Sequence, residues 1–540
     1  MSDTPLIVEN LSFRYRDRQG AAIHDISFDA KSGEVLLIAG ASGCGKTTLI
    51  RCINGLIPRS YKGEMNGLVE VFGEEVKSWP LSRISQKIGT VLQDPERQIL
   101  GTKVLNEVAF GLENLSVPRE EIIERVDEAL GFLKISHLRN RETFHLSGGE
   151  KQKVALAGVL AMRPSILLLD EPLASLDPAS AQDTLDTVRF LADQGMTVLM
   201  VEHRVEDVLR IKPNRVMFMS EGEIRYLGNL SGLSDVVNYR EVKLPAEDIV
   251  KLAAHNPPPA ELKLLPGAQG DGSKKEPLVK FENVDFGYES QTEVLHGINL
   301  EIHRGDVIAV LGPNGAGKTT FVKHAIGLLK PKSGRVLVGG RDTRETSVAQ
   351  IANTLGYVFQ SPSHMLFAPT VHEELAFGPT NLRHSKEQIE QEVKEALKIV
   401  NLAEKEQDPP LALSFGQQKR VSIAAILAMR SRILIMDEPT AGQDYQNYMN
   451  FMDSILQMPG FEAVLFITHD VDLAVIYANR VLMISNGRLV ADGSPQEVLH
   501  DFNRLEANRL IPTSLLALNL KRFSQTGRFM RAEALAHVSS

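Results

Sequence analysis

Two glycine-rich segments of this sequence carry the pattern of a loop that binds phosphate. GASGCGKTT reads G-x-x-x-x-G-K-T and returns as GPNGAGKTT, with the second lysine 272 positions after the first. Glycines let backbone N–H groups converge on phosphate oxygens, and the helix expected behind each loop favours negative charge at its N-terminus. Lys46 and Lys318 would then neutralise the β- and γ-phosphates, and Thr47 and Thr319 would ligate Mg²⁺. A chance glycine-rich turn could explain one match, but two matches between a predicted strand and a predicted helix favour phosphate binding.

The two candidate loops are compared position by position. The first comprises Gly40, Ala41, Ser42, Gly43, Cys44, Gly45, Lys46, Thr47 and Thr48, and the second comprises Gly312, Pro313, Asn314, Gly315, Ala316, Gly317, Lys318, Thr319 and Thr320. Cys44 is interpreted as a small side chain that the loop tolerates.

Acidic residues follow two apolar runs, SILLLD and RILIMD, at about 120 residues after each candidate loop. Asp170 and Asp437 end these runs and would hold Mg²⁺ through water. Glu171 and Glu438 come next, and a carboxylate there can orient or deprotonate an attacking water. An acid that caps a helix would explain one such pair, but its recurrence behind both loops favours the catalytic interpretation.

About 20 residues before these acids the chain reads LSGGE and LSFGQ. A hydroxyl and backbone N–H groups at a helix N-terminus are suitable donors to an anionic oxygen, although a simple turn would also contain such residues. The candidate anion-binding residues are Ser147, Gly148, Gly149 and Glu150 in the first half and Ser414, Phe415, Gly416 and Gln417 in the second.

Polar residues that end other predicted strands complete the set. Gln93 and Gln360 follow TVL and YVF, and His203 and His469 end VEH and ITH. A neutral imidazole could donate a hydrogen bond to the γ-phosphate and hold the neighbouring glutamate. A lone histidine at a strand end is usually structural, but the same order of motifs in both halves favours a functional role.

The elements that must position these residues are visible as continuous apolar runs. EVLLIA, SILLLD and TVLMVE recur in the second half as DVIAVL, RILIMD and AVLFIT, as is typical of strands buried on both faces of a parallel sheet. Helical periodicity occupies the middle of each half. Ile122, Val126, Ala129 and Leu133 follow it in the first half; Ile389, Val393, Leu397 and Val400 follow it in the second, behind the capping pair Ser385 and Gln388. Each half is therefore predicted as an α/β core with a helical insertion.

Length and composition agree with a duplicated globular chain. The protein has 540 residues, 43% of them hydrophobic and 24% charged, with a formal net charge of -9. This balance argues against a nucleic-acid partner or an anionic membrane surface. The only cysteines, Cys44 and Cys52, suggest neither a disulfide scaffold nor a metal site. No signal segment and no apolar run of about 20 residues is found, so a membrane role is expected to come through a partner.

The repeat sets the expected domain organisation. We predict a first domain over 1–244, a linker over 245–277, a second domain over 278–510 and a C-terminal tail over 511–540. The linker carries Pro257–Pro259 and the glycine-containing stretch Gly267–Lys275, which favour extended and then flexible chain. A solvated segment is the simplest interpretation of the basic and aromatic tail, with contact to a partner or to lipid headgroups as the alternative.

Taken together, the ordered motifs resemble those of an ABC ATPase: Walker A, Q-loop, signature, Walker B, D-loop and H-loop, twice. The resemblance implies two P-loop NTPase domains, each a RecA-like α/β core with a helical subdomain, arranged head to tail about a pseudo-twofold axis. It implies ATP and Mg²⁺ as ligands and ATP hydrolysis as the activity. Gln93 and Gln360 would sense Mg²⁺ or the attacking water, and Asp177 and Asp444 match the D-loop.

The resemblance also implies that each signature serves the site of the opposite half. Ser147 and Gly149 would complete the site of Lys318, and Ser414 and Gly416 that of Lys46. Phe415 and Glu150 depart from the usual glycine and glutamine, and the second D-loop reads AGQD in place of ASLD. These departures leave the relative rates of the two sites open.

Two tyrosines lie near the expected nucleotide. Tyr15 and Tyr288 precede their lysines by 31 and 30 residues and fit the aromatic platform that stacks on adenine. A core tyrosine is the alternative interpretation at each position.

The segments after the Q-loops, VLQDPERQILGTKVLNEVAFGLENL and VFQSPSHMLFAPTVHEELAFGPTNL, resemble energy-coupling factor (ECF) importer ATPases. The first contains QDPERQ, which fits the pattern Q-x-P-[DE]-x-Q. The second departs from that pattern at Ser363, His364 and Met365, where the acid and the second glutamine are missing. The ECF resemblance implies a transmembrane T component, a substrate-binding S component for a vitamin or transition metal, and a peripheral location on the cytoplasmic face of the membrane. Another importer class, or a soluble non-transport ABC protein such as a ribosome-associated factor, remains the alternative.

Overall fold

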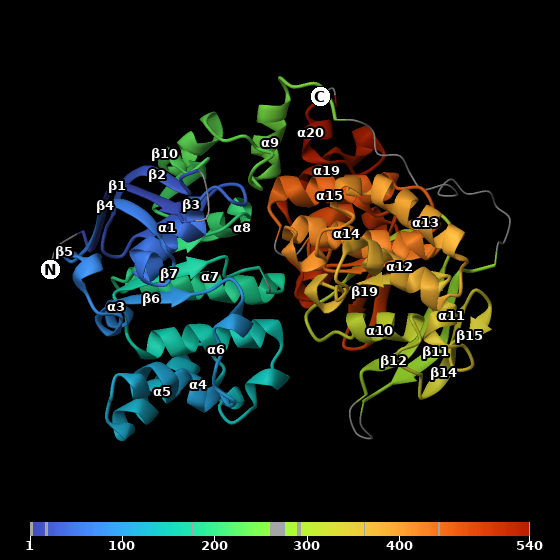
Figure 1. Ribbon diagram of the computed structural model, residues 1–540, viewed down its shortest axis with the longest axis horizontal. Coiled ribbons are helices and arrows are strands. Elements are labelled where there is room, and N and C mark those ends of the chain that lie inside the picture. The colour runs from blue at the N-terminus through green and yellow to red at the C-terminus, as the bar shows by residue number, and fades with distance from the viewer. Residues whose placement is uncertain are drawn as a thin grey trace. The chain divides into compact units, whose positions relative to one another are not determined.

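The protein is described by a computed structural model (Figure 1). Its described residues are 4–16, 20–174, 176–259, 276–288, 293–360, 362–440 and 443–538. They divide into two compact units: the first comprises 1–252 with Asp444–Gln446, and the second comprises 253–443 with 447–540. No helix among the described residues combines the length and the apolar character needed to cross a bilayer.

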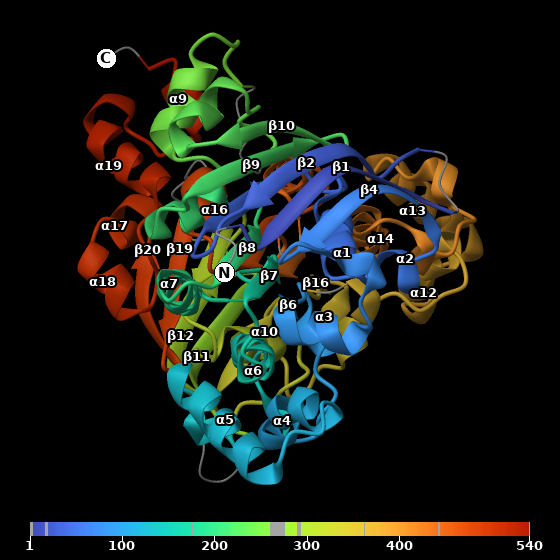
Figure 2. The same ribbon diagram turned by 90° about the vertical axis from the view of Figure 1, so that its left-hand side faces the viewer.

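The first unit is built on two sheets. The antiparallel sheet has the order β2 (Ile23–Ala30), β1 (Leu6–Tyr15), β4 (Gly63–Val71), β5 (Glu74–Glu75). The second sheet has the order β10 (Glu223–Gly228), β9 (Arg215–Ser220), β3 (Val35–Ala39), β8 (Thr197–Val201), β7 (Ile166–Asp170), β6 (Ile88–Val91). Strand β10 packs against β2 and so brings the two sheets together (Figure 2).

The helices of the first unit comprise a helical subdomain and the helices outside it (Figures 1 and 2). Those outside the subdomain are α1 (Lys46–Ile53), α2 (Leu56–Arg59), α3 (Leu81–Lys87), α7 (Pro178–Asp193), α8 (Val205–Val208) and α9 (Ala246–Ala253). The helical subdomain comprises α4 (Val104–Asn114), α5 (Arg119–Phe132) and α6 (Gly148–Ala161), which contact one another.

The second unit repeats this plan. Its antiparallel sheet has the order β12 (Leu295–Ile302), β11 (Val279–Phe286), β14 (Ser333–Val338), β15 (Arg341–Asp342). Its larger sheet has the order β16 (Leu355–Val358), β17 (Ile433–Asp437), β18 (Ala463–Ile467), β13 (Val307–Leu311), β19 (Arg480–Ser485), β20 (Arg488–Gly493). Its helices are α10 (Lys318–Ala325), α11 (Val348–Ala352), α12 (Val371–Asn381), α13 (Lys386–Ile399), α14 (Phe415–Ala428), α15 (Tyr445–Gln457), α16 (Val471–Tyr477), α17 (Pro495–Leu499), α18 (Phe502–Ala507), α19 (Ser514–Thr526) and α20 (Ala532–Leu535).

The apolar runs are the buried parallel strands that the sequence predicts. Strands β3, β7 and β8 pair in parallel and are buried along their whole length, as are β13 and β18. The predicted capping box is also present, since Ser385 and Gln388 exchange side-chain-to-backbone hydrogen bonds at the start of α13. The expected α/β class, with a helical subdomain in each half, is confirmed.

Parallel pairing decides where the candidate residues meet. The carboxyl ends of parallel strands lie at one edge of a sheet, where ligands of α/β proteins usually bind. In the first unit the phosphate loop follows β3, the acidic pair ends β7, and His203 follows β8. Gln93 follows β6 at the same edge, so one edge collects four motifs that are far apart in the sequence.

Two expectations about the connecting and terminal segments need correction. The expected linker region over 245–277 begins with helix α9, which buries Ile249; its glycine-containing stretch lies outside the described residues. The tail is not a solvated segment: α19 buries Leu516 and Asn519, and α19 packs against α16. Arg531 pairs with Asp453 of α15 at 2.7 Å. Apolar spacing within α19 supplies a face that covers the second unit.

Candidate functional site

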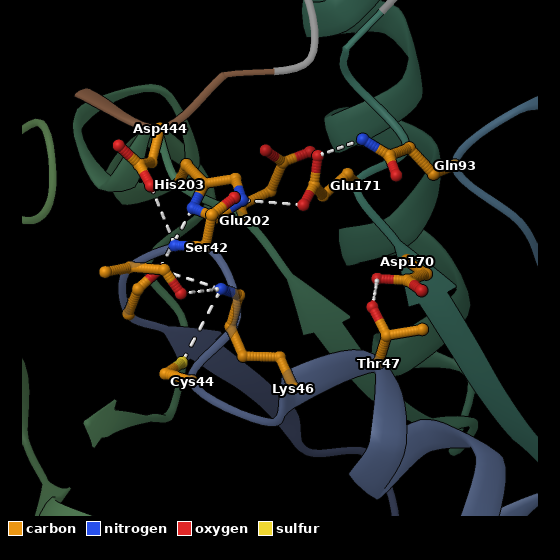
Figure 3. Close-up of polar contacts among 12 residues, drawn as sticks. Ser42, Cys44, Lys46, Thr47, Gln93, Asp170, Glu171, Glu202, His203 and Asp444 are labelled. Atoms are coloured by element: carbon orange, nitrogen blue, oxygen red, sulfur yellow. Dashed lines mark hydrogen bonds and ion pairs between the residues drawn. The ribbon is translucent and has the colours of Figure 1, made fainter. Parts of the chain in front are cut away.

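The phosphate loop of the first unit has a backbone that only glycine tolerates well. Gly40 has φ +149° and Gly45 has φ +106°, and a Cβ at Gly40 would lie 2.2 Å from the Met219 carbonyl oxygen. The loop leads into α1, which begins at Lys46. Lys46 Nζ donates to the carbonyls of Gly40 and Ala41, both at 2.8 Å (Figure 3). The ammonium group therefore lies inside the loop that is predicted from the sequence to bind phosphate.

The phosphate loop of the second unit has a similar glycine conformation and the same kind of lysine contacts. Gly312 has φ +149°, and a Cβ there would lie 2.0 Å from the Ile484 carbonyl oxygen. Lys318 begins α10, and its Nζ donates to the carbonyls of Gly312 at 2.6 Å and Pro313 at 2.9 Å. Both lysines are almost completely buried. Each loop thus offers backbone N–H groups, a helix N-terminus and one fixed cation.

Each loop threonine faces the aspartate that ends the neighbouring strand. Thr47 Oγ1 donates to Asp170 Oδ1 at 3.4 Å, and Thr319 Oγ1 donates to Asp437 Oδ2 at 3.1 Å. Burial, reinforced by the charge of the adjacent glutamate, raises the pKa of Asp170. Burial also raises the pKa of Asp437, against the hydrogen bond from Tyr357. A hydroxyl beside a desolvated carboxylate is an oxygen donor set suited to a hard divalent cation.

Glu171 is held at both carboxylate oxygens. Its Oε1 lies 2.6 Å from His203 Nε2, and its Oε2 accepts from Gln93 Nε2 at 2.6 Å (Figure 3). His203 Nδ1 lies 3.0 Å from the Gly40 carbonyl, which can only accept, so this nitrogen carries a hydrogen. Burial raises the pKa of Glu171, but the hydrogen bond and charge of His203, with Lys46, outweigh it and leave the pKa below its usual value.

The backbone of both candidate glutamates is unusual. Glu171 has φ +51° and Glu438 has φ +44°, the left-handed region that costs a non-glycine residue of order 1–3 kcal/mol. Each amide donates to the neighbouring strand, Glu171 to Val201 at 3.0 Å and Glu438 to Ile467 at 2.9 Å. The turn therefore holds the carboxylate toward the phosphate loop in both units.

Glu438 differs from Glu171 in its partners. Its Oε1 lies 3.0 Å from His469 Nδ1, whereas in the first unit the Nε2 atom of the histidine faces the glutamate. Burial raises the pKa of Glu438, and the charge of His469 with its hydrogen bond brings the pKa below its usual value. The Gln360 side chain is exposed and, within the described part of the chain, makes no contact with Glu438 like that of Gln93.

The signature residues form helix N-caps. Ser147 caps α6 in a capping box with Glu150, whose carboxylate also accepts from the Ser147 hydroxyl at 2.9 Å. Ser414 caps α14 in the same way with Gln417. The glycines Gly148, Gly149 and Gly416 lie in the first turns, and Phe415 is the first residue of α14. Each unit thus presents a hydroxyl and backbone N–H groups at a helix start.

The tyrosines and the D-loop aspartates also have defined positions. The Tyr15 hydroxyl lies 3.2 Å from Thr48 Oγ1, and that of Tyr288 lies 3.2 Å from Thr320 Oγ1. Tyr288 is 58% exposed, which does not fit a core residue. Asp177 caps α7 through the Ser180 amide.

Asp444 belongs to the segment that clusters with the first unit. It accepts a hydrogen bond from the Ser42 amide at 2.8 Å (Figure 3).

Three polar side chains around these motifs were not predicted. Glu202 follows β8, is 3% exposed and accepts from the Leu173 amide at 3.0 Å; burial and then the charge of Glu171 raise its pKa well above the usual value. Lys419 on α14 donates to the Pro439 carbonyl at 2.5 Å. Tyr357 contacts Asp437, and burial followed by the charge of that carboxylate raises the pKa of the phenol. Only a charged residue inside an apolar pattern could have marked the first two.

Comparison with known proteins identifies the class. The family model of the ABC transporter matches residues 23–174 and 295–441. A protein of Methanosarcina mazei described as an ABC transporter ATP-binding protein is 35% identical over 558 residues, covering 96% of this chain and 95% of its own. A relative from Caldanaerobacter subterraneus subsp. tengcongensis with the same description is 36% identical over 550 residues, covering 96% of both chains.

Among solved structures, cbiO1 from Clostridium perfringens, described as part of the ABC transporter complex cbiONQ, is 33% identical. It covers 43% of this chain and 96% of its own, with a TM-score of 0.40. The family match and the two full-length relatives show that the chain belongs to the ABC transporter family, as its ATP-binding component. The ATPase domain occurs twice, and the chain is an ATPase of the family that uses ATP with Mg²⁺.

Proposed function

We propose that the chain is the energy-coupling ATPase of an ECF-type membrane importer, with two MgATP sites that each draw on both halves. One observation carries the catalytic part. In each unit a glutamate in a left-handed turn, Glu171 or Glu438, is paired with a strand-end histidine beside a phosphate loop whose lysine is buried.

The residues present fit ATP and Mg²⁺. Glycine-only backbone lines the loop, a lysine supplies the cation, and a threonine hydroxyl meets a buried aspartate. Bound MgATP supplies the γ-phosphoryl group and the metal charge that stabilises its transfer. Lys46 would bind the β- and γ-phosphates, and Thr47 with Asp170 would hold the metal. Lys318, Thr319 and Asp437 have the corresponding roles in the second unit.

The glutamates would act on water. Glu171 has a pKa below the usual value, so it is ionised at neutral pH and can accept a proton or orient water for in-line attack. His203 and Gln93 fix its two oxygens, which lowers the entropic cost of reaching the reactive geometry. His203 would share its Nε2 hydrogen between Glu171 and the γ-phosphate, and Gln93 would report the state of the metal or water.

The remaining assignments follow family resemblance. The domain limits are proposed at 1–244 and 278–510, with the signature of each half completing the nucleotide site of the other. Ser147 and Ser414 are capped helix starts, which suits donation to a phosphate oxygen. Fusion in one chain raises the effective concentration of each half for the other.

Exposed apolar side chains beside the Q-loops support a membrane partner. Leu100 and Phe110 in the first unit, at 69% and 44% exposure, correspond to Phe367 and Phe377 in the second, at 61% and 52%. Each pair lies 7 and 17 residues after its Q-loop glutamine, Gln93 or Gln360. Apolar residues exposed at matched positions favour docking of two helices from a transmembrane subunit.

The ECF assignment rests on the post-Q-loop sequences, including VAFG and LAFG, which contain two of these exposed phenylalanines. A T component would dock there, and an S component would select a vitamin or a transition metal. The chain would then lie peripherally on the cytoplasmic face of the membrane.

The catalytic assignment is tested with the double variant Glu171→Gln and Glu438→Gln. We expect ATP affinity to persist while steady-state hydrolysis falls at least about 100-fold, the usual weight of a general base. Glu202→Gln is the matched control, because its buried carboxyl can still accept from Leu173 as an amide. Substantial hydrolysis by the double variant would refute the roles given to the two glutamates.

The partner assignment is tested by purification from detergent-solubilised membranes. The wild-type chain should retain an integral membrane subunit, and Phe110→Asp with Phe377→Asp should lose it without losing ATPase activity. Phe190→Asp, at a residue that is 51% exposed on α7, controls for adding charge to an exposed ring. Salt-dependent sedimentation with ribosomes in place of membrane retention would favour the non-transport alternative.

A further inference from the structure

A phenol in the second unit touches the carboxylate proposed to hold the metal. Tyr357 lies on β16, is 8% exposed, and donates its hydroxyl to Asp437 Oδ2 at 2.8 Å. Thr319 Oγ1 donates to the same oxygen at 3.1 Å. Two donors on one carboxylate oxygen fix the rotation of the group and leave Oδ1 as the oxygen that neither hydroxyl contacts.

The first unit offers a matched position without this contact. Thr90 on β6 pairs with Leu168, two residues before Asp170, as Tyr357 pairs with Ile435, two residues before Asp437. The Thr90 hydroxyl instead accepts from Asn54 Nδ2 at 3.3 Å.

The residue that corresponds to Asn54 also differs between the two units. Asn54 lies eight residues after Lys46, and the residue eight after Lys318 is Ile326. The second unit therefore has Ile326 and Tyr357 in place of the hydrogen-bonded Asn54 and Thr90, and its phenol contacts Asp437.

We propose that Tyr357 is a positioning residue that strengthens Mg²⁺ binding at the second phosphate loop by orienting Asp437, so that the two sites differ in metal affinity. The inference rests on the proposed role of Asp437 in holding the metal. Partners behind a metal ligand orient it, and their loss typically weakens metal binding 10- to 100-fold. Because Asp437 would act through water, we expect a smaller effect, roughly 3- to 10-fold.

Tyr357→Phe isolates the hydroxyl, because it keeps the ring and its edge contact with Phe359 at 4.8 Å. The probe is Mn²⁺, titrated by electron paramagnetic resonance into the full chain with ATP. The background carries Glu171→Gln and Glu438→Gln, so that ATP persists during the measurement.

In the background protein, two bound Mn²⁺ ions are expected. Tyr357→Phe should weaken the binding of one Mn²⁺ ion about 3- to 10-fold. Thr90→Val, which removes the matched hydroxyl that does not contact Asp170, should weaken neither. ATP affinity in EDTA should be the same in all proteins, which separates metal binding from loss of structure.

Failure of this inference and failure of the proposed function give different results. If Asp437→Asn weakens one Mn²⁺ ion but Tyr357→Phe changes none, or changes both equally, the role of Tyr357 is overturned. If Asp170→Asn and Asp437→Asn both leave Mn²⁺ binding unchanged, the proposed metal sites themselves fail.

A transplant provides an independent measurement should Tyr357→Phe prove too unstable to titrate. Asn54→Ile with Thr90→Tyr gives the first unit the pair found in the second. The transplant should raise the Mn²⁺ affinity of the weaker site toward that of the stronger site. An unchanged or lower affinity at the weaker site would overturn the proposal.

Discussion

Lys419 should make the stability of the second unit rise with pH above neutrality. The side chain is 1% exposed on α14, and its Nζ donates to the Pro439 carbonyl directly after Glu438. Burial lowers the pKa of Lys419 from 10.5 to about 7, against the opposing charge of Glu438. The folded unit therefore binds fewer protons than the unfolded chain between about pH 7 and pH 10.5, and deprotonation favours folding in that window.

The size of the effect follows from proton linkage. Each pH unit within the window contributes at most about 1.4 kcal/mol for one proton. Since the group is half titrated at the lower limit, the gain in the free energy of unfolding between about pH 7 and pH 8.5 is about 1.6 kcal/mol. Lys419→Met removes the titrating group while keeping an unbranched side chain, so the variant should lack this gain.

The assay must separate the two units. Trp79 is the single tryptophan and lies in the first unit, so its fluorescence follows that unit during urea denaturation. Circular dichroism follows both units, and the remaining transition reports the second. Gln152→Met, at the corresponding position of α6, is the control and should add no pH dependence because it removes an uncharged group. The free energy of unfolding of the wild type minus that of Lys419→Met should rise over this range. If that difference stays constant from about pH 7 to pH 8.5, the argued desolvation of Lys419 is refuted.

Three further predictions concern the loop, the signature and the terminal helices. Gly312→Ala should lower ATP affinity at the second loop and destabilise the second unit by about 1–3 kcal/mol, because a Cβ would meet the Ile484 carbonyl; calorimetry would detect both effects, and wild-type affinity would contradict the argument. Glu150→Gln should lower the apparent KM for ATP about 2- to 5-fold, since a carboxylate beside the signature serine opposes phosphate; a higher KM in steady-state assays would oppose this. Asp453→Asn should expose α19 and α20 to limited proteolysis by weakening the pair with Arg531, and unchanged cleavage would show that apolar packing alone holds them.

The proximity of Glu171 and His203 can be predicted from the sequence because parallel strands restrict where their ends can lie. Glu171 and His203 end consecutive apolar runs, and the carboxyl ends of neighbouring parallel strands lie together. The strand assignments therefore predict, almost without further information, that the two side chains lie at one edge of the sheet. Capping is equally local, which explains why the Ser385–Gln388 box was found from residues three apart.

Contacts between elements distant in sequence were not predictable in the same way. The pair Tyr357–Asp437 joins residues 80 apart, and neither the strand pattern nor the residue types specify that the phenol reaches the carboxylate. The prediction of a solvated C-terminal tail is wrong for a related reason. Its composition suggested solvent exposure, whereas Arg531 is stabilised by Asp453 and by the nearby ring of Tyr477, partners that only the fold provides.

The two units share the residue types of their proposed sites and differ in the side chains that contact those residues. Gln93 donates to Glu171, whereas no such contact joins Gln360 to Glu438 among the described residues. Tyr357 contacts Asp437, whereas Thr90 contacts Asn54. In a homodimer any substitution enters both sites at once, so a change that suits only one of them is constrained by its cost at the other. Fusion removes that constraint because each half mutates alone. Non-equivalence is then expected first in supporting side chains, where a changed hydrogen bond tunes metal affinity or carboxylate orientation without removing a group that the chemistry requires.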